Sequence, residues 1–415
     1  ALTAAAAWLL PGRRRAAARL AWLAEHRGEV LALEALFAVG FMVFLGIRMG
    51  NPDLWHPWYG GEKPMDFAYL NATLRSVSFP PFDPWFSGGK LNYYYYGFVF
   101  VGALFELTRV PPWIGYNLAI PSLAAMTGLG CAGVVWGWAR SQGIEAGRAR
   151  AAGSLAGLMA VLMGNLFQVP FILGKGAELV DGTLGDPAAP AGFSSRIPGL
   201  ALAVNGLRGL VQAALSPTQI LNVPTGHWYW NASRAIPEQG ETVAITEMPF
   251  FTFVYADLHA HMMALPITVL ALACALSWAL PTRGEEEGWW WLEPWGLGRL
   301  LLAALAIGAL WPANTWDFPT YGLVAAGALG AGLWQRLGGP SLRWLWAVLW
   351  RGLLLLGLSL LLFKPYHDNY VTPYADFNFW MGVKTPLAAF LTVHGIFLAA
   401  ILGWALWQLN DALGL

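Results

Sequence analysis

The stretch WIGYNLAIPSLAAMTGLGCAGVVWGWA, residues 113–139, runs for 27 positions without a charged side chain. About 20 apolar residues in helical conformation cross the hydrocarbon core of a bilayer, where an unpaired backbone N–H or C=O group is costly. The stretch therefore predicts a membrane-spanning helix. It decides the fold class, because seven further runs of the same kind are spread along the 415-residue chain.

The composition of the whole chain agrees with this prediction. Hydrophobic residues make up 57% of the sequence and charged residues only 12%, so the chain lacks the polar side chains that a water-exposed surface needs. The 24 basic and 24 acidic residues give a net charge of zero, which argues against a nucleic-acid partner. Two cysteines in apolar runs predict neither a disulfide framework nor a zinc site.

The apolar runs predict an all-α, polytopic transmembrane protein that forms a single transmembrane domain over residues 1–415. The eight predicted spans are residues 29–49, 113–139, 150–172, 255–281, 297–313, 317–336, 344–364 and 386–409. The chain opens at Ala1 without a methionine, and Trp8-Leu9-Leu10 looks like the end of an apolar run. We therefore expect the natural polypeptide to begin earlier.

Arginine-bearing loops predict the orientation, because short cytoplasmic loops carry an excess of Lys and Arg. With alternating spans, the groups that fall on one side are Arg13–Arg15 with Arg19 and Arg27, Arg140 with Arg148 and Arg150, Arg283 with Arg299, and Arg336 with Arg343. This holds only if the apolar segment 93–108 lies on the outer face as a juxtamembrane helix instead of crossing. The sequence thus predicts a multi-pass protein of the cell membrane whose long outer loops are residues 50–112, 173–254 (with a short surface helix over 199–215) and 365–385.

The first outer loop contains the most informative carboxylate. Asp66 begins an amphipathic stretch in which Leu70, Leu74 and Val77 follow at helical spacing. The helix dipole favours a carboxylate near a helix N-terminus, and in this position we expect Asp66 to point outward into a wet pocket. From the spacing alone, Asp66 is either an ordinary helix cap or a functional acid.

The loop around Asp66 resembles that of the GT-C glycosyltransferases, which include the protein mannosyltransferases, the aminoarabinose transferases and the oligosaccharyltransferases. The likeness rests on a carboxylate after the first span, a short helix, a Gly-rich turn and an aromatic and proline run that leads into a juxtamembrane helix. It implies that Asp66 is the counterpart of the catalytic acid. Many relatives carry a second acid beside the first, but here Phe67 takes that place, and Glu62 or Asp83 are the candidates to substitute for it.

More closely, the chain resembles the YYY-motif membrane family known from archaea and Chloroflexi, over roughly residues 29–400. The segments that carry the likeness are Met65 to Ala68, the FPPFDPWF run of 79–86, Asn92 to Gly97, Thr246 to Phe251, Asp257 to His261 and Asn314 to Pro319. This resemblance implies family membership, whereas the reaction is inferred only from the GT-C likeness.

Ionisable residues beside spans are costly to place there and are therefore functional candidates. Asp257, His259 and His261 at the outer end of the fourth span are candidate ligands of a divalent metal such as Mg or Mn, candidate phosphate or sugar contacts, or structural hydrogen-bonding groups. The candidates for binding the sugar or its phosphate are Arg75, Lys90, Tyr94, Tyr95, His227, Arg234, Glu247, Asp317, Lys364 and His367.

Three of these candidates have an ordinary structural alternative. Asp317 is equally suited to cap the sixth spanning helix. Lys364 is equally suited to extend to the membrane interface. The aromatic residues beside His227 are equally suited to anchor the second loop at a membrane surface.

The GT-C resemblance implies a glycosyltransferase that moves a sugar, with inversion, from a polyprenyl-phosphate or diphosphate donor to an acceptor on the extracytoplasmic face. Asp66 is the predicted general base, and a basic residue or a metal would neutralise the leaving phosphate. The competing hypothesis is non-enzymatic: a transporter or flippase for lipid-linked glycans, or a scaffold subunit of a larger membrane assembly. A transporter favours ionisable residues near the bilayer midplane, whereas here the acids concentrate at the outer ends of the spans.

Overall fold

A computed structural model describes residues 21, 23–55, 61–181, 199–216, 223, 227–236, 244–280, 294–371, 379 and 381–413. Some of the arginines that support the predicted orientation lie outside these residues, namely Arg13, Arg14, Arg15, Arg19 and Arg283. Within them the chain forms helices joined by turns and forms no strand. Six of the helices are long and apolar enough to cross a membrane, so the prediction of an all-α polytopic membrane protein is confirmed.

The six candidate spans each overlap a predicted span. They are α3 (Arg27–Gly50), α6 (Pro112–Ser141), α12 (Ala260–Ala279), α13 (Pro294–Ala313), α15 (Leu342–Leu362) and α17 (Leu387–Leu413). The helix α14 (Asp317–Leu337) forms where a further span was predicted but is not among the six. Four glycines, an aspartate and an arginine dilute its apolar residues.

The prediction of a single helix over residues 150–172 is wrong. The structure has α7 (Ala146–Leu162) and α8 (Gln168–Asp181), with non-helical residues between them. The Asn165 side chain accounts for the break: its Oδ1 accepts a hydrogen bond from the Phe167 N–H at 3.1 Å, and its Nδ2 donates to the Ala232 carbonyl at 2.6 Å. Asparagine competes in this way with the helical backbone, so apolar periodicity alone does not extend the helix.

The helices divide into two compact units. The first unit consists of residues 1–161 and 253–375, and the second of residues 162–252 and 376–415. The second unit contains α8, α17 and the short helix α9 (Leu200–Leu215), which confirms the helix predicted over 199–215. The prediction that the whole chain is one transmembrane domain stays a prediction.

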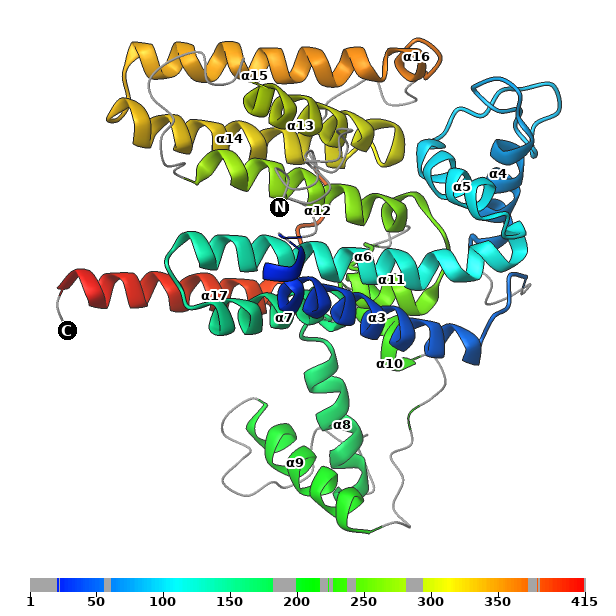
Figure 1. Ribbon diagram of the computed structural model, residues 1–415. Coiled ribbons are helices and arrows are strands. Elements are labelled where there is room, and N and C mark those ends of the chain that lie inside the picture. The colour runs from blue at the N-terminus through cyan, green and yellow to red at the C-terminus, as the bar shows by residue number, and fades with distance from the viewer. Residues whose placement is uncertain are drawn as a thin grey trace. The chain divides into compact units, whose positions relative to one another are not determined.

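In the first unit, layers of long helices pack against one another. The helices α12, α13, α14 and α15 lie side by side, and α12 also packs on α6, which packs on α3 (Figure 1). At one end of these helices lie α4 (Lys63–Arg75) and α5 (Tyr96–Thr108), which contact each other (Figure 1). The 13 residues of α5 extend about 20 Å, too short to cross a bilayer, which agrees with the prediction that 93–108 does not span.

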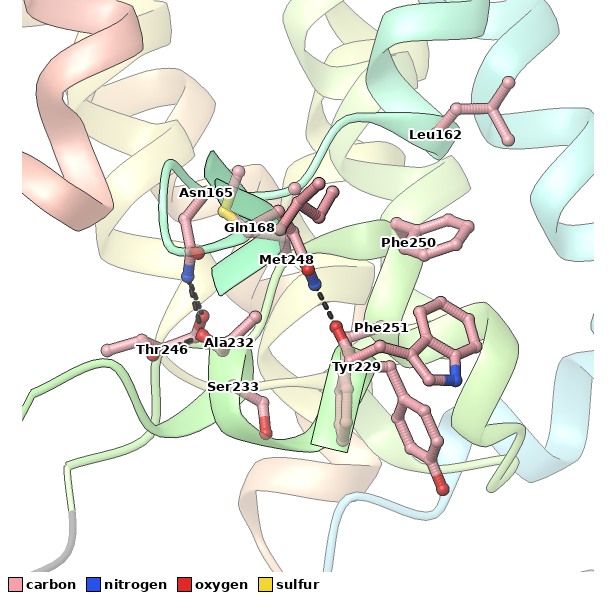
Figure 2. A pocket seen from close by; sticks show the side chains of 13 residues that line it. Leu162, Asn165, Gln168, Tyr229, Ala232, Ser233, Thr246, Met248, Phe250 and Phe251 are labelled. Atoms are coloured by element: carbon pink, nitrogen blue, oxygen red, sulfur yellow. Dashed lines mark hydrogen bonds between the residues drawn. The ribbon is translucent and has the colours of Figure 1, made fainter. Parts of the chain in front are cut away.

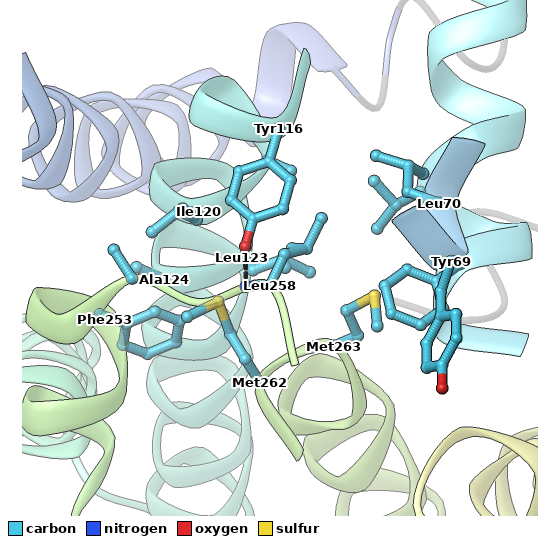
Figure 3. Close-up of a cluster of buried hydrophobic side chains, with 14 of the residues drawn as sticks. Tyr69, Leu70, Tyr116, Ile120, Leu123, Ala124, Phe253, Leu258, Met262 and Met263 are labelled. Carbon is cyan, nitrogen blue, oxygen red and sulfur yellow. Dashed lines mark hydrogen bonds between the residues drawn. The ribbon is translucent and has the colours of Figure 1, made fainter. Parts of the chain in front are cut away.

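An apolar core joins α4 to the long helices at this end. Figure 3 shows Tyr69 and Leu70 of α4 beside Met263 of α12, with Tyr116 of α6 and Phe253 in the same buried cluster. These side chains are at most 9% exposed, so α4 is held by the hydrophobic effect and not by the loop alone.

Two small residues let α7 approach α6 closely. A Cβ atom added at Gly157 of α7 would lie 2.5 Å from the backbone carbonyl oxygen of Gly128 in α6. Small residues at such crossings allow backbones to meet without a side chain between them, which is a common way to pack helices within a membrane.

We expect Gly157→Ala to destabilise the protein by about 1–3 kcal/mol, because the added methyl group overlaps a backbone atom that cannot move aside. The measurement is the thermal unfolding midpoint of the detergent-purified protein. The matched control is Gly133→Ala in α6, where an added Cβ meets nothing within 4 Å and where the change raises helix propensity. Equal midpoints for the two variants would contradict the close approach.

Candidate functional site

The candidate site lies at the end of the first unit where the beginning of α12 meets the segments that follow α3. Two hydrogen bonds fix this junction. The Leu258 N–H donates to the Tyr116 hydroxyl at 2.7 Å, and Arg48 Nε donates to Asn117 Oδ1 at 2.6 Å. They tie α3 and α6 to the residues just before α12, so these helix ends lie together.

The helix α4 places Asp66 on its buried face. Gly61, with φ of +59°, provides the turn before the helix, and Pro64 suits the first turn because its missing N–H has no intrahelical partner there. Asp66, Leu70 and Thr73 follow at spacings of four and three, so all three lie on the face that packs inward. The prediction that Asp66 is near a helix N-terminus is confirmed.

The prediction that Asp66 points outward into a wet pocket is wrong, because Asp66 is 0% exposed. Leu70, one turn further along α4, is equally buried, and its burial in the apolar core places the same face of the helix, with Asp66, in the interior. The acid that faces solvent is Glu62, whose side chain is 55% exposed.

His259 connects the two acids. Its Nδ1 lies 2.9 Å from Glu62 Oε2 and 3.1 Å from Asp66 Oδ1, and its Nε2 lies 3.1 Å from the Tyr93 hydroxyl. We call Glu62, Asp66, Tyr93 and His259 the acid–histidine cluster. The second carboxylate oxygen of Asp66, Oδ2, is buried and has no hydrogen-bond partner among the residues that the structure describes.

The charges of the cluster follow from these contacts. Burial by itself would lower the pKa of His259, but hydrogen bonds and negative charge from Asp66 and Glu62 outweigh it and raise the pKa to about 10. His259 is therefore an imidazolium at neutral pH, with both ring N–H groups available to donate. The hydrogen bond from His259 lowers the pKa of Glu62, whereas burial raises the pKa of Asp66 above its ordinary value.

Further charged groups are buried around the cluster. Lys63 is 5% exposed, and its Nζ lies 4.5 Å from the centre of the Tyr255 ring. Burial lowers the pKa of Lys63, and the negative charge of Asp257 opposes this effect. Asp257 itself is 7% exposed. Positive and negative groups thus alternate in a part of the molecule that is largely shielded from water.

The predicted metal ligands His259 and His261 are close together, but the ring nitrogens of His259 already contact protein oxygens. His259 and His261 have ring centres 5.4 Å apart, and both ring nitrogens of His259 already face protein oxygens. Across the described ranges, no group of three or more His, Cys, Asp or Glu side chains is arranged to hold a metal ion. The divalent metal therefore stays a prediction from the sequence.

The run of tyrosines packs beside the cluster. Tyr94 contacts Tyr93, with ring centres 4.9 Å apart, and is partly buried. Tyr95 is 3% exposed and packs on Tyr366, whose hydroxyl donates to the Tyr93 carbonyl at 3.2 Å. Tyr95 is therefore a core residue in this structure, and Tyr93, which was not predicted as a site residue, is the tyrosine whose hydroxyl contacts His259.

Two further unsatisfied groups lie on Trp311 and on His367, whose ring centre is 5.9 Å from that of Tyr366. Trp311 and His367 meet edge to face, with ring centres 4.9 Å apart, and both Trp311 Nε1 and His367 Nε2 are buried with no partner within the described part of the chain. Burial lowers the pKa of His367, which favours the neutral form of its ring. A polar atom of a bound molecule would satisfy such groups.

The remaining candidates of the first unit lie outside the cluster. Lys364 pairs with Asp368 at 2.6 Å on the surface, and Asp317 accepts a hydrogen bond from Asn314 at 3.0 Å. Asp317 is the first residue of α14 and not its cap. The Lys90 ammonium lies over the Phe82 ring at 3.7 Å, and Arg75 is exposed in the last turn of α4, where a cation is favoured by the helix dipole.

Three predicted residues belong to the second unit. Arg234 Nη1 lies 3.1 Å from Glu247 Oε1, and its guanidinium covers the Trp230 ring at 4.9 Å. His227 begins the four-residue helix α10 (His227–Trp230) and is exposed. Arg234 and Glu247 therefore form an ion pair of their own.

Sequence reasoning missed Tyr93 and Lys63. Tyr93 is the first of four consecutive tyrosines, and nothing in the sequence marks which of them reaches His259. Lys63 stands directly beside Glu62, so its position was visible, but its burial depends on packing against Tyr255.

One comparison with known proteins identifies a relationship. The model of a protein family described as uncharacterized membrane protein (DUF2298) matches residues 1–413. No curated protein and no solved structure matches the chain.

The raised pKa of His259 predicts how stability depends on pH. Because the pKa is 6.5 in the ordinary state and about 10 in the folded protein, protonation of His259 stabilises the fold fully below pH 6.5, and this contribution is lost as the pH rises through 10. We therefore expect the thermal midpoint of the unmodified protein to exceed that of His259→Gln at pH 6.5 and to approach it at pH 10. The control is His227→Gln, which replaces an exposed histidine and should change the midpoint little. A constant difference for His259→Gln would contradict the assignment.

Proposed function

The chain belongs to this family of membrane proteins, and we propose that it is a glycosyltransferase of the GT-C type in which Asp66 removes the proton from an acceptor hydroxyl. The donor is a sugar on a polyprenyl phosphate or diphosphate, and the active face is the extracytoplasmic face of the cell membrane. The GT-C resemblance of the first outer loop suggests the reaction class, and the acid–histidine cluster suggests which groups act.

The free oxygen of Asp66 is the observation that carries this proposal. One carboxylate oxygen is held by His259, and the other is buried without a partner among described residues, which is costly unless something binds there. Burial also raises the pKa of Asp66 above its ordinary value. A carboxylate with a raised pKa is a stronger base than an ordinary one, so both features suit Asp66 to this role.

The other members of the cluster are less suited to be the base. His259 is already protonated at neutral pH, because its pKa is about 10. Glu62 has a lowered pKa and a largely exposed side chain, so it is the weaker base. We assign His259 to positioning Asp66 Oδ1, and Glu62 to stabilising the imidazolium.

The proposed step is a single displacement. The acceptor O–H bond breaks and its proton passes to Asp66 Oδ2, while the acceptor oxygen forms a bond to the anomeric carbon. The bond from that carbon to the phosphate oxygen breaks with its electron pair on the phosphate, and the configuration inverts. Arg48 and Lys63, which are buried at the same end of the unit, provide positive charge toward an anionic leaving group.

We expect Asp66→Asn to lower sugar transfer by about 10²- to 10⁴-fold, the usual contribution of a general base. The assay measures transfer of labelled sugar from a panel of polyprenyl-phosphate hexoses to membrane acceptors. Asparagine keeps the shape of the side chain and is neutral, so the folded protein should persist, and the thermal midpoint checks this. The matched control is Glu106→Gln on the exposed face of α5.

Two further outcomes decide between the roles. Glu62→Gln should lower transfer less than Asp66→Asn does, because Glu62 acts only through His259. If a folded Asp66→Asn variant transfers sugar at the rate of Glu106→Gln, Asp66 is not the base and the proposal fails.

A further inference from the structure

The second unit contains a cavity that is separate from the acid–histidine cluster. Its volume is about 260 Å³. Figure 2 shows it between Leu162, the start of α8, the aromatic side chains of α10 and the segment that ends in Phe250 and Phe251. The apolar residues that line it are Leu162, Ile172, Trp228, Tyr229, Met248, Phe250 and Phe251.

Four polar side chains at the wall of this cavity donate hydrogen bonds to backbone carbonyls of the protein itself. Gln168 Nε2 donates to the Trp228 carbonyl, and Asn165 Nδ2 donates to the Ala232 carbonyl (Figure 2). Ser233 Oγ donates to the Trp230 carbonyl at 2.6 Å, and Thr246 Oγ1 donates to that of Ala232 at 3.0 Å. These groups shape the wall by donating to backbone carbonyls.

Most of the lining side chains are apolar, and a wall of this kind favours an apolar ligand. A water molecule in a cavity needs two to four polar partners, and dry cavities lined by apolar side chains bind hydrocarbons instead. A cavity of about 150 Å³ accommodates benzene, so about 260 Å³ corresponds to about ten carbon atoms. The aromatic side chains supply contact area at low entropic cost.

We propose that this cavity binds one hydrocarbon chain of a membrane lipid. The protein belongs to a family of membrane proteins, so the acyl and prenyl chains of lipids are the apolar molecules that it meets at high concentration. The ion pair of Arg234 and Glu247 adjoins the wall, because Arg234 follows the lining residue Ser233 directly and bonds to its hydroxyl. The proposal does not depend on Asp66 or on sugar transfer.

Gly164 offers a way to fill the cavity without disturbing the fold. It lines the cavity, lies outside the helices, and an added Cβ would meet nothing within 4 Å. A leucine at this position would therefore extend into open space. Gly174 in α8 gives the matched control, because an added Cβ there also meets nothing within 4 Å and the residue does not line the cavity.

The test is photo-crosslinking in nanodiscs. Two probes are used in separate experiments: a phosphatidylcholine with a diazirine in one acyl chain, and a polyprenyl phosphate with a diazirine in its chain. Labelled peptides are mapped by mass spectrometry, and labelling of the segment 244–251 is normalised to labelling of α17, a candidate span with mostly exposed side chains. We expect the unmodified protein and Gly164→Ala to label this segment, and Gly164→Leu to lose most of the labelling.

The outcomes answer two questions: which lipid supplies the bound hydrocarbon chain, and whether the cavity binds such a chain at all. Stronger labelling by one probe identifies that lipid as the source, and labelling by both identifies a general chain site. Equal labelling of Gly164→Leu and Gly174→Leu would overturn the proposal, as would absence of label from 244–251 with both probes. If Gly164→Leu lowers the thermal midpoint, Ile172→Phe fills the cavity from α8 and must give the same loss. Because sugar transfer is not the readout, this result is independent of the Asp66→Asn experiment.

Discussion

The contact of His259 Nδ1 with two carboxylates is the interaction on which the rest of the candidate site depends. It joins α4, which lies in the loop after α3, to the N-terminus of α12, and the acid on α4 is fully buried. A buried carboxylate without a partner would be costly or would be protonated. The imidazolium permits a charge at Asp66 while leaving one of its oxygens unpaired, and an unpaired acceptor in a shielded place is what a proton-transfer site needs.

The physical constraint of the bilayer explains why the helices could be predicted so well. Lipid requires every backbone group to pair within its own helix, so long apolar runs have few alternatives, and the predicted positions of α3, α6, α12, α13, α15 and α17 follow. The constraint weakens where polar side chains enter a run. Asn165 bonds to a carbonyl 67 residues away, and this distant contact, which no local pattern reveals, ends the helix that periodicity would continue.

The features of the candidate site likewise have either local or distant causes in the sequence. The position of Asp66 in the first turn of α4 follows from neighbouring residues, and it was predictable. Its burial depends on Leu70 and on the packing of α4 against α12 and α5, and the sequence suggested the opposite. The choice of Tyr93 over Tyr95 as the partner of His259 depends on a contact across 166 residues. A single sequence thus does not predict which charged groups are brought together by tertiary packing.

The long separation between Asp66 and His259 also concerns how the protein is made. The two residues are 193 positions apart, and at about 5–20 residues per second a ribosome needs about 10–40 s to produce the second after the first. During this interval the carboxyl group of a newly inserted chain has no imidazolium to pair with and must remain hydrated or hold a proton. A nascent chain that ends before His259 therefore carries an acid whose partner has not yet been made.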